Sequence, residues 1–297
     1  MGAWLVPFTY DYMLKAILVS AIVGGACGLL SAYLMLKGWS LIGDALAHAI
    51  VPGVALAYLL ALPYALGAFV AGLLAAAAIG AIRVQTTLRQ DAILGIVFTS
   101  FFAAGLLIAS LYPTSINIQT IVLGNILAIS DADVIQVVAI CVIVMAFIAL
   151  KWRDLMVVFF DENHARSVGV SPRLLNALFF ALLAAAIVAA LQAVGAVLVL
   201  ALVVTPGATA YLLSDRFSRV LLIAAGFGAV TSAAGAYLSY FLDGATGGVI
   251  VVLQTVLFLA AFIAAPRHGL LAARRSAAAV VAASGDGGVR APPGGPA

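Results

Sequence analysis

Long apolar stretches, separated by short polar segments, run through most of this 297-residue chain. A helix of about 20 predominantly apolar residues is long enough to cross a hydrocarbon layer about 30 Å thick. Nine stretches approach or exceed that length: 14–36, 41–60, 64–82, 92–111, 134–150, 174–194, 196–213, 220–242 and 247–265. The pattern predicts an all-α, polytopic membrane protein with about nine transmembrane helices. Because the joints at 61–63 and 192–195 are short, a total of eight or ten helices is also compatible with the sequence.

The composition agrees with a membrane location. Hydrophobic residues make up 66% of the chain and charged residues 8%, at a mean hydropathy of +1.24, whereas a soluble domain carries about 25% charged residues. Residues 1–12 contain no basic segment ahead of a short apolar core and a cleavage site, so we expect no cleaved signal peptide. The chain is expected to enter the membrane through its own spans.

Lysine and arginine are distributed unevenly over the predicted loops. If nine spans alternate in direction, Lys15 falls on one side and the other 13 of the 14 basic residues fall on the opposite side. Short loops rich in lysine and arginine stay in the cytoplasm, so the C-terminus is predicted to be cytoplasmic and the N-terminus external. The net charge of +3 reflects this bias, and the chain carries no signature of nucleic-acid binding.

Two further features predict structure rather than chemistry. Residues 267–297 are rich in alanine, glycine and proline, which predicts a disordered cytoplasmic tail after a transmembrane domain of residues 1–266.

Cys27 and Cys141 lie within predicted spans and show no CxxC or disulfide pattern. We expect both cysteines to be small packing residues.

The most informative polar residues lie inside the second apolar stretch. Asp44 and His48 are four residues apart, so a helix places both side chains on one face. Ionisable side chains at membrane depth are costly and usually functional, and a carboxylate and an imidazole are both ligands for divalent transition metals. The pair predicts a metal site in a membrane, and the alternative is a polar pair that holds helices together.

Two prolines interrupt predicted spans. Pro52 has no amide hydrogen, so the carbonyl of His48 loses its helical partner, and Pro206 does the same to the carbonyl of Leu202. We therefore predict helix breaks at Pro52 and Pro206. Breaks at membrane depth are tolerated where they line a cavity or are buried in protein, and the sequence leaves both settings open.

The sequence holds no energy source for transport. It contains no GxxxxGK(S/T) phosphate-binding loop, so ATP would have to act on a partner subunit and the chain is not expected to be an enzyme. A gradient-driven secondary metal carrier is the alternative, but it should carry several intramembrane acids, and only Asp44 lies clearly within a span. An intramembrane metalloprotease is disfavoured because no HExxH-like cluster occurs.

Several segments resemble the blocks of one known family, in that family's order. The segment SLIGDALAHAIVPGVALAYLL, which contains Asp44 and His48, closely resembles the signature of permease subunits of bacterial ABC importers for manganese, zinc and iron, the ABC-3 family. Residues 91–108, 122–130, 160–170, 194–213 and 237–253 are similar to the later blocks. The resemblance covers nearly all of residues 13–266, with a small departure at Gly207, where the family more often has alanine.

The resemblance implies an ATP-driven importer that moves a divalent metal ion (manganese, zinc or iron) across the bacterial cytoplasmic membrane. It implies the permease fold of the vitamin B12 importer, a homodimer with the path between two copies, cytoplasmic ABC ATPase subunits that bind ATP, and an extracytoplasmic metal-binding protein. No cofactor is expected on this chain. The segment FDENHARSVGV is implied to contain a coupling helix that contacts the ATPase through Glu162, Ala165, Arg166, Gly169 and Val170, with a solvent-exposed His164.

Overall fold

The computed structural model describes residues 3–112 and 129–265, and the predicted tail at 267–297 lies outside the described residues. The elements in chain order are η1 (Ala3–Thr9), α1 (Asp11–Lys37), α2 (Ser40–Ala49), α3 (Val51–Leu59), α4 (Tyr64–Gln85), α5 (Gln90–Leu111), α7 (Asp131–Phe160), α8 (Glu162–Ser167), α9 (Pro172–Val194), α10 (Ala196–Leu213), α11 (Phe217–Leu242) and α12 (Thr246–Ala264). No strand occurs in these described ranges. The prediction of an all-α membrane protein is confirmed.

The predicted spans correspond to helices of the structure. In the described part, eight apolar segments are long enough to cross a membrane, with α2 and α3 taken together as one segment. The ninth predicted span is α10, whose apolar part Leu198–Leu213 is shorter. The predicted span at 41–60 is divided in the structure: α2 ends at Ala49 and α3 begins at Val51, with Pro52, where the sequence predicts a break, in its first turn. Proline fits a first turn because the amides there have no helical partner.

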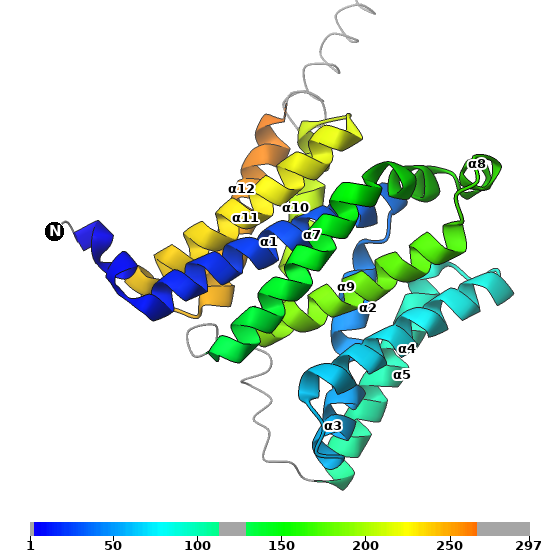
Figure 1. The fold of residues 1–297 in the computed structure, drawn as a ribbon, viewed down its shortest axis with the longest axis horizontal. Coiled ribbons are helices and arrows are strands. Elements are labelled where there is room, and N and C mark those ends of the chain that lie inside the picture. Colours follow the sequence, from blue (N-terminus) through cyan, green and yellow to red (C-terminus); the bar gives the residue numbers. More distant parts are fainter. Residues whose placement is uncertain (1–2, 113–128, 266–297) are drawn as a thin grey trace, which may run out of the picture.

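The helices form two groups that lie side by side in Figure 1. In the first group α1 packs along α11 and α10, with α7, α9 and α12 around them. The backbones approach closely: a Cβ on Gly24 would lie 2.3 Å from the carbonyl oxygen of Gly228, and a Cβ on Gly28 2.3 Å from that of Ala224. Small residues stabilise helix pairs in this way in lipid, where apolar attraction between helices is weak.

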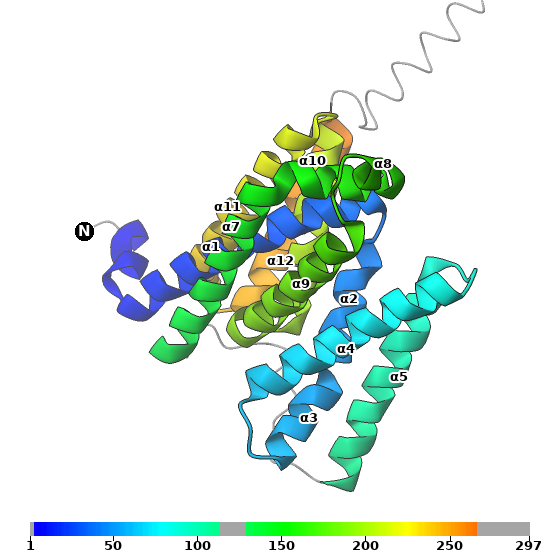
Figure 2. The same ribbon diagram turned by 45° about the vertical axis from the view of Figure 1, so that its right-hand side comes forward.

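The second group contains α2, α3, α4 and α5 (Figure 2). α3 meets α4 at a glycine pair, since a Cβ on Gly53 would lie 2.0 Å from the carbonyl oxygen of Gly67. α5 is more peripheral, because 22% of its most apolar window is buried, compared with 61% for the α2–α3 segment. α2 joins the two groups at Gly43, where an added Cβ would lie 2.4 Å from a methyl carbon of Val203 in α10.

Pro206 does not divide α10, which runs unbroken past it. Around Pro206 the helix instead exchanges hydrogen bonds with a neighbouring helix. Ser31 Oγ of α1 accepts a bond from the Gly207 amide (2.9 Å) and donates one to the Val204 carbonyl (3.2 Å). A hydroxyl of the neighbouring helix therefore bonds to backbone groups on either side of Pro206, close to the Leu202 carbonyl that this proline leaves without a helical donor.

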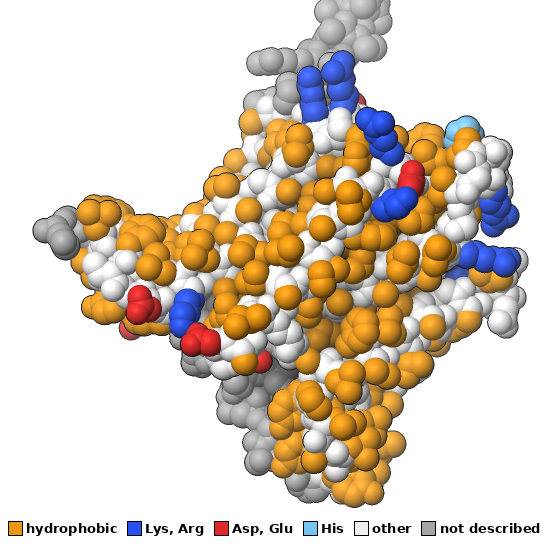
Figure 3. Space-filling view, in the orientation of Figure 1, with side chains coloured by type: hydrophobic (Ala, Val, Ile, Leu, Met, Phe, Trp, Pro, Cys, Tyr) orange, Lys and Arg blue, Asp and Glu red, His pale blue; other side chains and the backbone are white. Residues whose placement is uncertain are grey.

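Charged side chains separate toward the two ends of the helices (Figure 3). Lysine and arginine side chains gather at the upper and right-hand end of the view, and several acidic side chains lie at the opposite, lower left end. Lys37 pairs with Glu162 at the basic end, and Lys15 pairs with Asp131 at the other. A largely apolar surface lies between the two ends, as helices that cross a membrane require.

Candidate functional site

A single sharp turn leads from α1 into α2 and so positions the predicted metal pair. Gly38 has a left-handed backbone with φ of 69°. The amides of Gly38 and Trp39 bond back to the carbonyls of Met35 (3.1 Å) and Leu34 (2.7 Å). This is the Schellman arrangement, which favours glycine because a Cβ is strained at positive φ. α2 then starts at Ser40.

Asp44 and His48 lie together on α2, as their spacing predicts. Oδ1 of Asp44 is 3.4 Å from Nε2 of His48, and the two side chains are 47% and 34% exposed within this chain. The other faces of α2 are buried, through residues such as Ile42, Leu46 and Ala49. The pair lies with Leu41, which is also exposed, on the accessible part of α2.

Aromatic rings of α5 hold the imidazole. The His48 ring meets Phe98 edge to face with centroids 5.1 Å apart and meets Phe102 at 5.6 Å. The two phenyl rings stack on each other at 6.0 Å. Such contacts orient a ring through its carbon atoms.

One chain holds fewer ligand groups than a complete metal site would need. Within residues 3–112 and 129–265, no three side chains of His, Cys, Asp or Glu come together as a metal-binding group. A zinc ion in a protein usually has about four ligands, or three and a water molecule. Asp44 and His48 therefore form at most half of a complete ligand set, at the surface of a single chain.

The junction between α2 and α3 lies directly against α5. A Cβ on Gly105 of α5 would lie 2.7 Å from a Val51 methyl carbon and 2.9 Å from the Pro52 nitrogen. α5 therefore needs glycine at the point where Pro52 lacks an amide hydrogen. The helix break, the phenyl rings and the metal pair all belong to the contact between α5 and the α2–α3 segment.

The segment predicted to couple to the ATPase forms the short helix α8. Its N-cap residue is Asp161, whose carboxylate accepts hydrogen bonds from the amides of His164 (3.1 Å) and Asn163 (2.8 Å). These two bonds favour the charged form and lower the pKa of Asp161 from its usual value. The side chain of His164 is exposed, as expected.

The five predicted contact residues differ in exposure. Ala165 is 0% exposed and Val170 packs against the core, and the Val170 amide bonds to the Ala165 carbonyl at 2.9 Å. Arg166 and Gly169 are exposed, Gly169 with φ of 80°, and Glu162 is half-buried. In this structure Ala165 and Val170 anchor α8, while Arg166, Gly169 and Glu162 offer a surface.

α8 also contacts the turn that leads to the metal pair. Oε1 of Glu162 lies 3.3 Å from Nζ of Lys37, the last residue of α1. Trp39, two residues further on, stacks on Phe180 of α9 with centroids 5.4 Å apart and lies 4.8 Å from the Arg83 guanidinium. The metal pair and α8 are thus two separate sites, and the turn at 37–39 connects them.

Sequence reasoning missed the side chains that hold these two sites. Phe98 and Phe102 have the spacing of any apolar helix face, so only the tertiary structure assigns them to His48. In the sequence Lys37 is indistinguishable from the other basic residues of the loops, and its partner Glu162 is 125 residues away. No signal in the sequence alone identifies either contact.

These parts together define a class of protein. Apolar helices of membrane-spanning length, a carboxylate and an imidazole beside a divided span, and a short capped helix at the basic end are the components of a multi-pass transport permease.

Comparison with known proteins identifies the family. The family model described as "ABC 3 transport family" matches residues 9–265, and this chain belongs to that family. The chain is 64% identical to "Chelated iron transport system membrane protein YfeC" of Yersinia pestis over 266 residues, 90% of this chain and 90% of that protein. It is 46% identical to "Manganese transport system membrane protein MntB" of Synechocystis sp. over 268 residues, 90% of this chain and 88% of that protein.

A solved structure shares the fold. PsaBC from Streptococcus pneumoniae, in complex with a Fab, matches with a TM-score of 0.80 at 32% identity, over 89% of this chain and 96% of the matched chain. The chain is therefore the membrane permease of an ABC transporter. The fold class expected from the sequence is confirmed.

Proposed function

We propose that this permease carries a divalent transition metal ion (manganese, iron or zinc) into the cytoplasm through a site that contains Asp44 and His48. The observation that carries the proposal is the accessible carboxylate and imidazole, 3.4 Å apart, on a membrane helix. Such a pair is costly in hydrocarbon unless it serves a function, and its ligand types suit all three metals. Support also comes from relatives named for iron and manganese transport.

A second copy of the chain completes the site in this proposal. Two copies supply two carboxylates and two imidazoles, which is a four-ligand set whose negative charge balances a divalent cation. The partial exposure of Asp44 and His48 supports a path between the copies, because both side chains are accessible from outside a single chain. The ion is the cargo of this site and passes through it, so the site must bind weakly enough to release it.

ATP hydrolysis is assigned to cytoplasmic ABC ATPase subunits that dock on α8. Arg166 and Gly169 are exposed there, and the ion pair of Glu162 with Lys37 links α8 to the turn before α2. A contact of this kind can transmit a displacement from one element to the next. The basic end is cytoplasmic by the distribution of lysine and arginine, which puts the C-terminus inside and a metal-binding protein at the external end.

The test is uptake by the complex of this permease and its ATPase in proteoliposomes. We expect uptake of Mn²⁺, Fe²⁺ or Zn²⁺ that requires ATP. Asp44→Ala and His48→Ala should each lower it by at least about tenfold, because loss of groups that hold a metal weakens a site by that order or more. Size-exclusion chromatography should show that both variants still assemble with the ATPase.

Asp154→Ala is the matched control, since Asp154 is a carboxylate of α7 that pairs with Lys151 at 3.0 Å, at the basic end. Its uptake should equal that of the wild type. Normal uptake by both site variants would mean that the pair only holds helices together. Uptake driven by an ion gradient without ATP would support the secondary carrier instead.

A further inference from the structure

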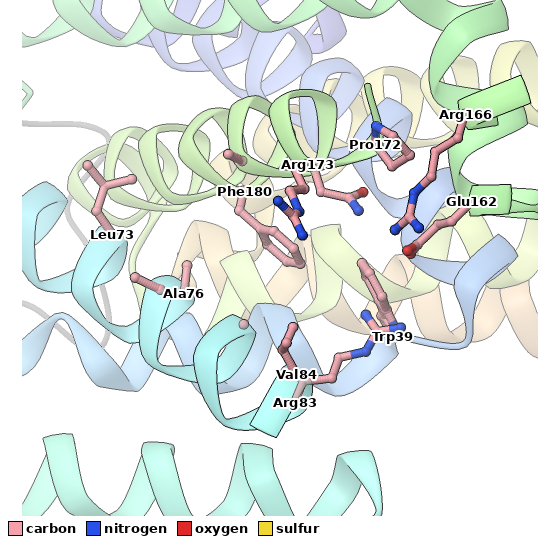
Figure 4. A pocket seen from close by; sticks show the side chains of 14 residues that line it. Trp39, Leu73, Ala76, Arg83, Val84, Glu162, Arg166, Pro172, Arg173 and Phe180 are labelled. Carbon is pink, nitrogen blue, oxygen red and sulfur yellow. The ribbon is translucent and has the colours of Figure 1, made fainter. Parts of the chain in front are cut away.

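A groove of about 540 Å³ opens at the basic end of the molecule, lined by α4, α8 and α9 (Figure 4). Arg83 reaches it from the end of α4, Arg166 from α8 and Arg173 from the first turn of α9. Trp39 and Phe180 line its wall. The metal pair does not line this groove, so the groove is separate from the proposed metal path.

The groove carries an excess of positive charge. Three guanidinium groups line it with a single carboxylate, that of Glu162, and this carboxylate already lies 3.3 Å from Lys37. In the part of the chain that the structure describes, none of Arg83, Arg166 and Arg173 forms an ion pair with a carboxylate. Guanidinium groups gathered in one groove favour a phosphate-type anion, which accepts their N–H groups in pairs.

The start of α9 adds to this positive potential. α9 begins at Pro172 in the wall of the groove and is 23 residues long, so its first-turn amides form the positive end of a long helix dipole. The side chain of the N-cap residue Ser171 makes no capping hydrogen bond. The cap residue therefore supplies no acceptor for these amides, and an anion in the groove is suited to that role.

Apart from Asn176, the rest of the lining is apolar and continues along α4 toward the middle of that helix. Leu73, Ala77 and Val84 contribute to it, and Val84 is 88% exposed. An acyl chain gains free energy from such a surface, whereas a small soluble anion does not. Arg83 lies 4.8 Å from the centre of the buried Trp39 ring in the wall of the groove, where a cation–π contact favours a guanidinium.

We propose that this groove binds an anionic glycerophospholipid of the cytoplasmic leaflet. The phosphodiester lies at Arg83 and Arg173, and an acyl chain follows Leu73 and Ala77 along α4. The proposal rests on the orientation given under the proposed function, in which the basic end is cytoplasmic. The lipid also touches Arg166 and so borders the helix on which the ATPase docks. Basic pockets between membrane helices bind anionic headgroups through this chemistry.

The test measures which lipids the purified permease–ATPase complex retains. The complex is equilibrated in nanodiscs with equal amounts of phosphatidylglycerol and phosphatidylcholine, released and analysed by native mass spectrometry. We expect about tenfold more phosphatidylglycerol than phosphatidylcholine on the wild type, and no preference on the double variant Arg83→Ala/Arg173→Ala, because charge-assisted contacts to phosphate are lost. Arg219→Ala, which removes an exposed arginine of α11, is the matched control and should keep the preference.

If the double variant fails to assemble, the variant Val84→Asp tests the proposal instead. It keeps both arginines and places a carboxylate at the exposed rim, where like charge should repel the phosphodiester and remove the preference. Phosphatidylglycerol retained at the wild-type level by either variant overturns the proposal.

Two further outcomes would assign the groove to another ligand. Displacement of the lipid by glycerol phosphate at equal concentration would mean that a soluble anion binds there. Retention of the lipid only after removal of the ATPase would mean that the ATPase fills the groove. Both outcomes overturn the lipid site. Neither bears on uptake through Asp44 and His48, because lipid retention is measured without metal.

Discussion

Pro52 and Pro206 remove the same amide hydrogen from two membrane helices, yet the surroundings of the two prolines differ. At Pro206 the helix continues, and the hydroxyl of Ser31 on α1 satisfies the Gly207 amide at 2.9 Å. At Pro52 the helix divides at Ile50, and the segment before the division carries the accessible metal pair. One proline is enclosed by hydrogen bonds, and the other borders a site.

The difference follows from the neighbouring helix. α1, which supplies Ser31, has 61% of its most apolar window buried, whereas α5, which covers the Pro52 junction, has 22%. Because the region around Pro206 is held by a hydroxyl of a buried helix, we expect it to keep a single conformation. A break covered by a glycine and two phenyl rings of a peripheral helix can change when that helix moves. We infer a structural role for Pro206 and a role in transport for Pro52.

The largest difference between the two prolines is expected when a neighbouring glycine is replaced by valine. These glycines are Gly207, which follows Pro206 in α10, and Gly105, which packs against Pro52 from α5. A Cβ on Gly207 would lie 2.5 Å from the Ser31 carbonyl oxygen, in the backbone of buried α1, so Gly207→Val should destabilise the fold by about 3 kcal/mol or more. On Gly105 the nearest atoms are a Val51 methyl carbon at 2.7 Å and the Pro52 nitrogen at 2.9 Å, and the peripheral helix α5 can shift away from both. Gly105→Val should therefore fold and assemble but lose uptake. Equal yields of folded protein from size-exclusion chromatography would contradict the comparison.

Alanine at Ser31 should have a smaller effect, on stability. Ser31→Ala removes the hydrogen bond between the buried Gly207 amide and the Ser31 hydroxyl, which costs about 0.5–1.5 kcal/mol and should lower the thermal unfolding midpoint in detergent by a few degrees. Ser20 provides the control, because it is also buried on α1 while its hydroxyl has no hydrogen-bond partner in the described residues. Ser20→Ala should change the midpoint little. Equal losses in both variants would mean that Ser31 contributes packing alone.

Leucine at Phe98 should have the smallest effect, on transport alone. Phe98→Leu keeps an apolar side chain but removes an edge-to-face contact with His48, worth about 0.5–1.5 kcal/mol, so uptake should fall roughly two- to tenfold. Thermal stability should stay near that of the wild type. Phe258→Leu, which removes one ring of a stacked pair with Phe262 on α12, should not change uptake. Full uptake by Phe98→Leu would show that the ring does not position the imidazole.

The helices are predicted well from the sequence, because a chain that crosses hydrocarbon must satisfy its backbone hydrogen bonds internally, and a helix does so. The stretch predicted at 64–82 is Tyr64–Gln85, and that at 174–194 is Pro172–Val194. The observed helices extend further mainly through polar residues such as Gln85, since a helix continues into the headgroup region where hydropathy gives no signal. For the span at 41–60 the sequence predicts a break from Pro52, and the structure divides it at Ile50, between the end of α2 at Ala49 and the start of α3 at Val51.

The candidate site was predictable only where its geometry is local. Asp44 and His48 are four residues apart, so helical periodicity alone brings them together. The hydrogen bond from Gly207 to Ser31 joins residues 176 apart in the chain. Contacts over such separations depend on how helices pack, and no period in the sequence encodes them.

The two ligands that one chain offers have a consequence for the cell that makes it. A newly inserted copy holds a carboxylate and an imidazole but no third group of the ligand types among its described residues, so under the proposed function we expect it to bind a divalent ion only weakly by itself. In the proposed dimer the full ligand set exists only after two copies have met. Single copies that wait in the membrane therefore neither sequester scarce metal nor let it leak, and permeability to the ion begins with assembly.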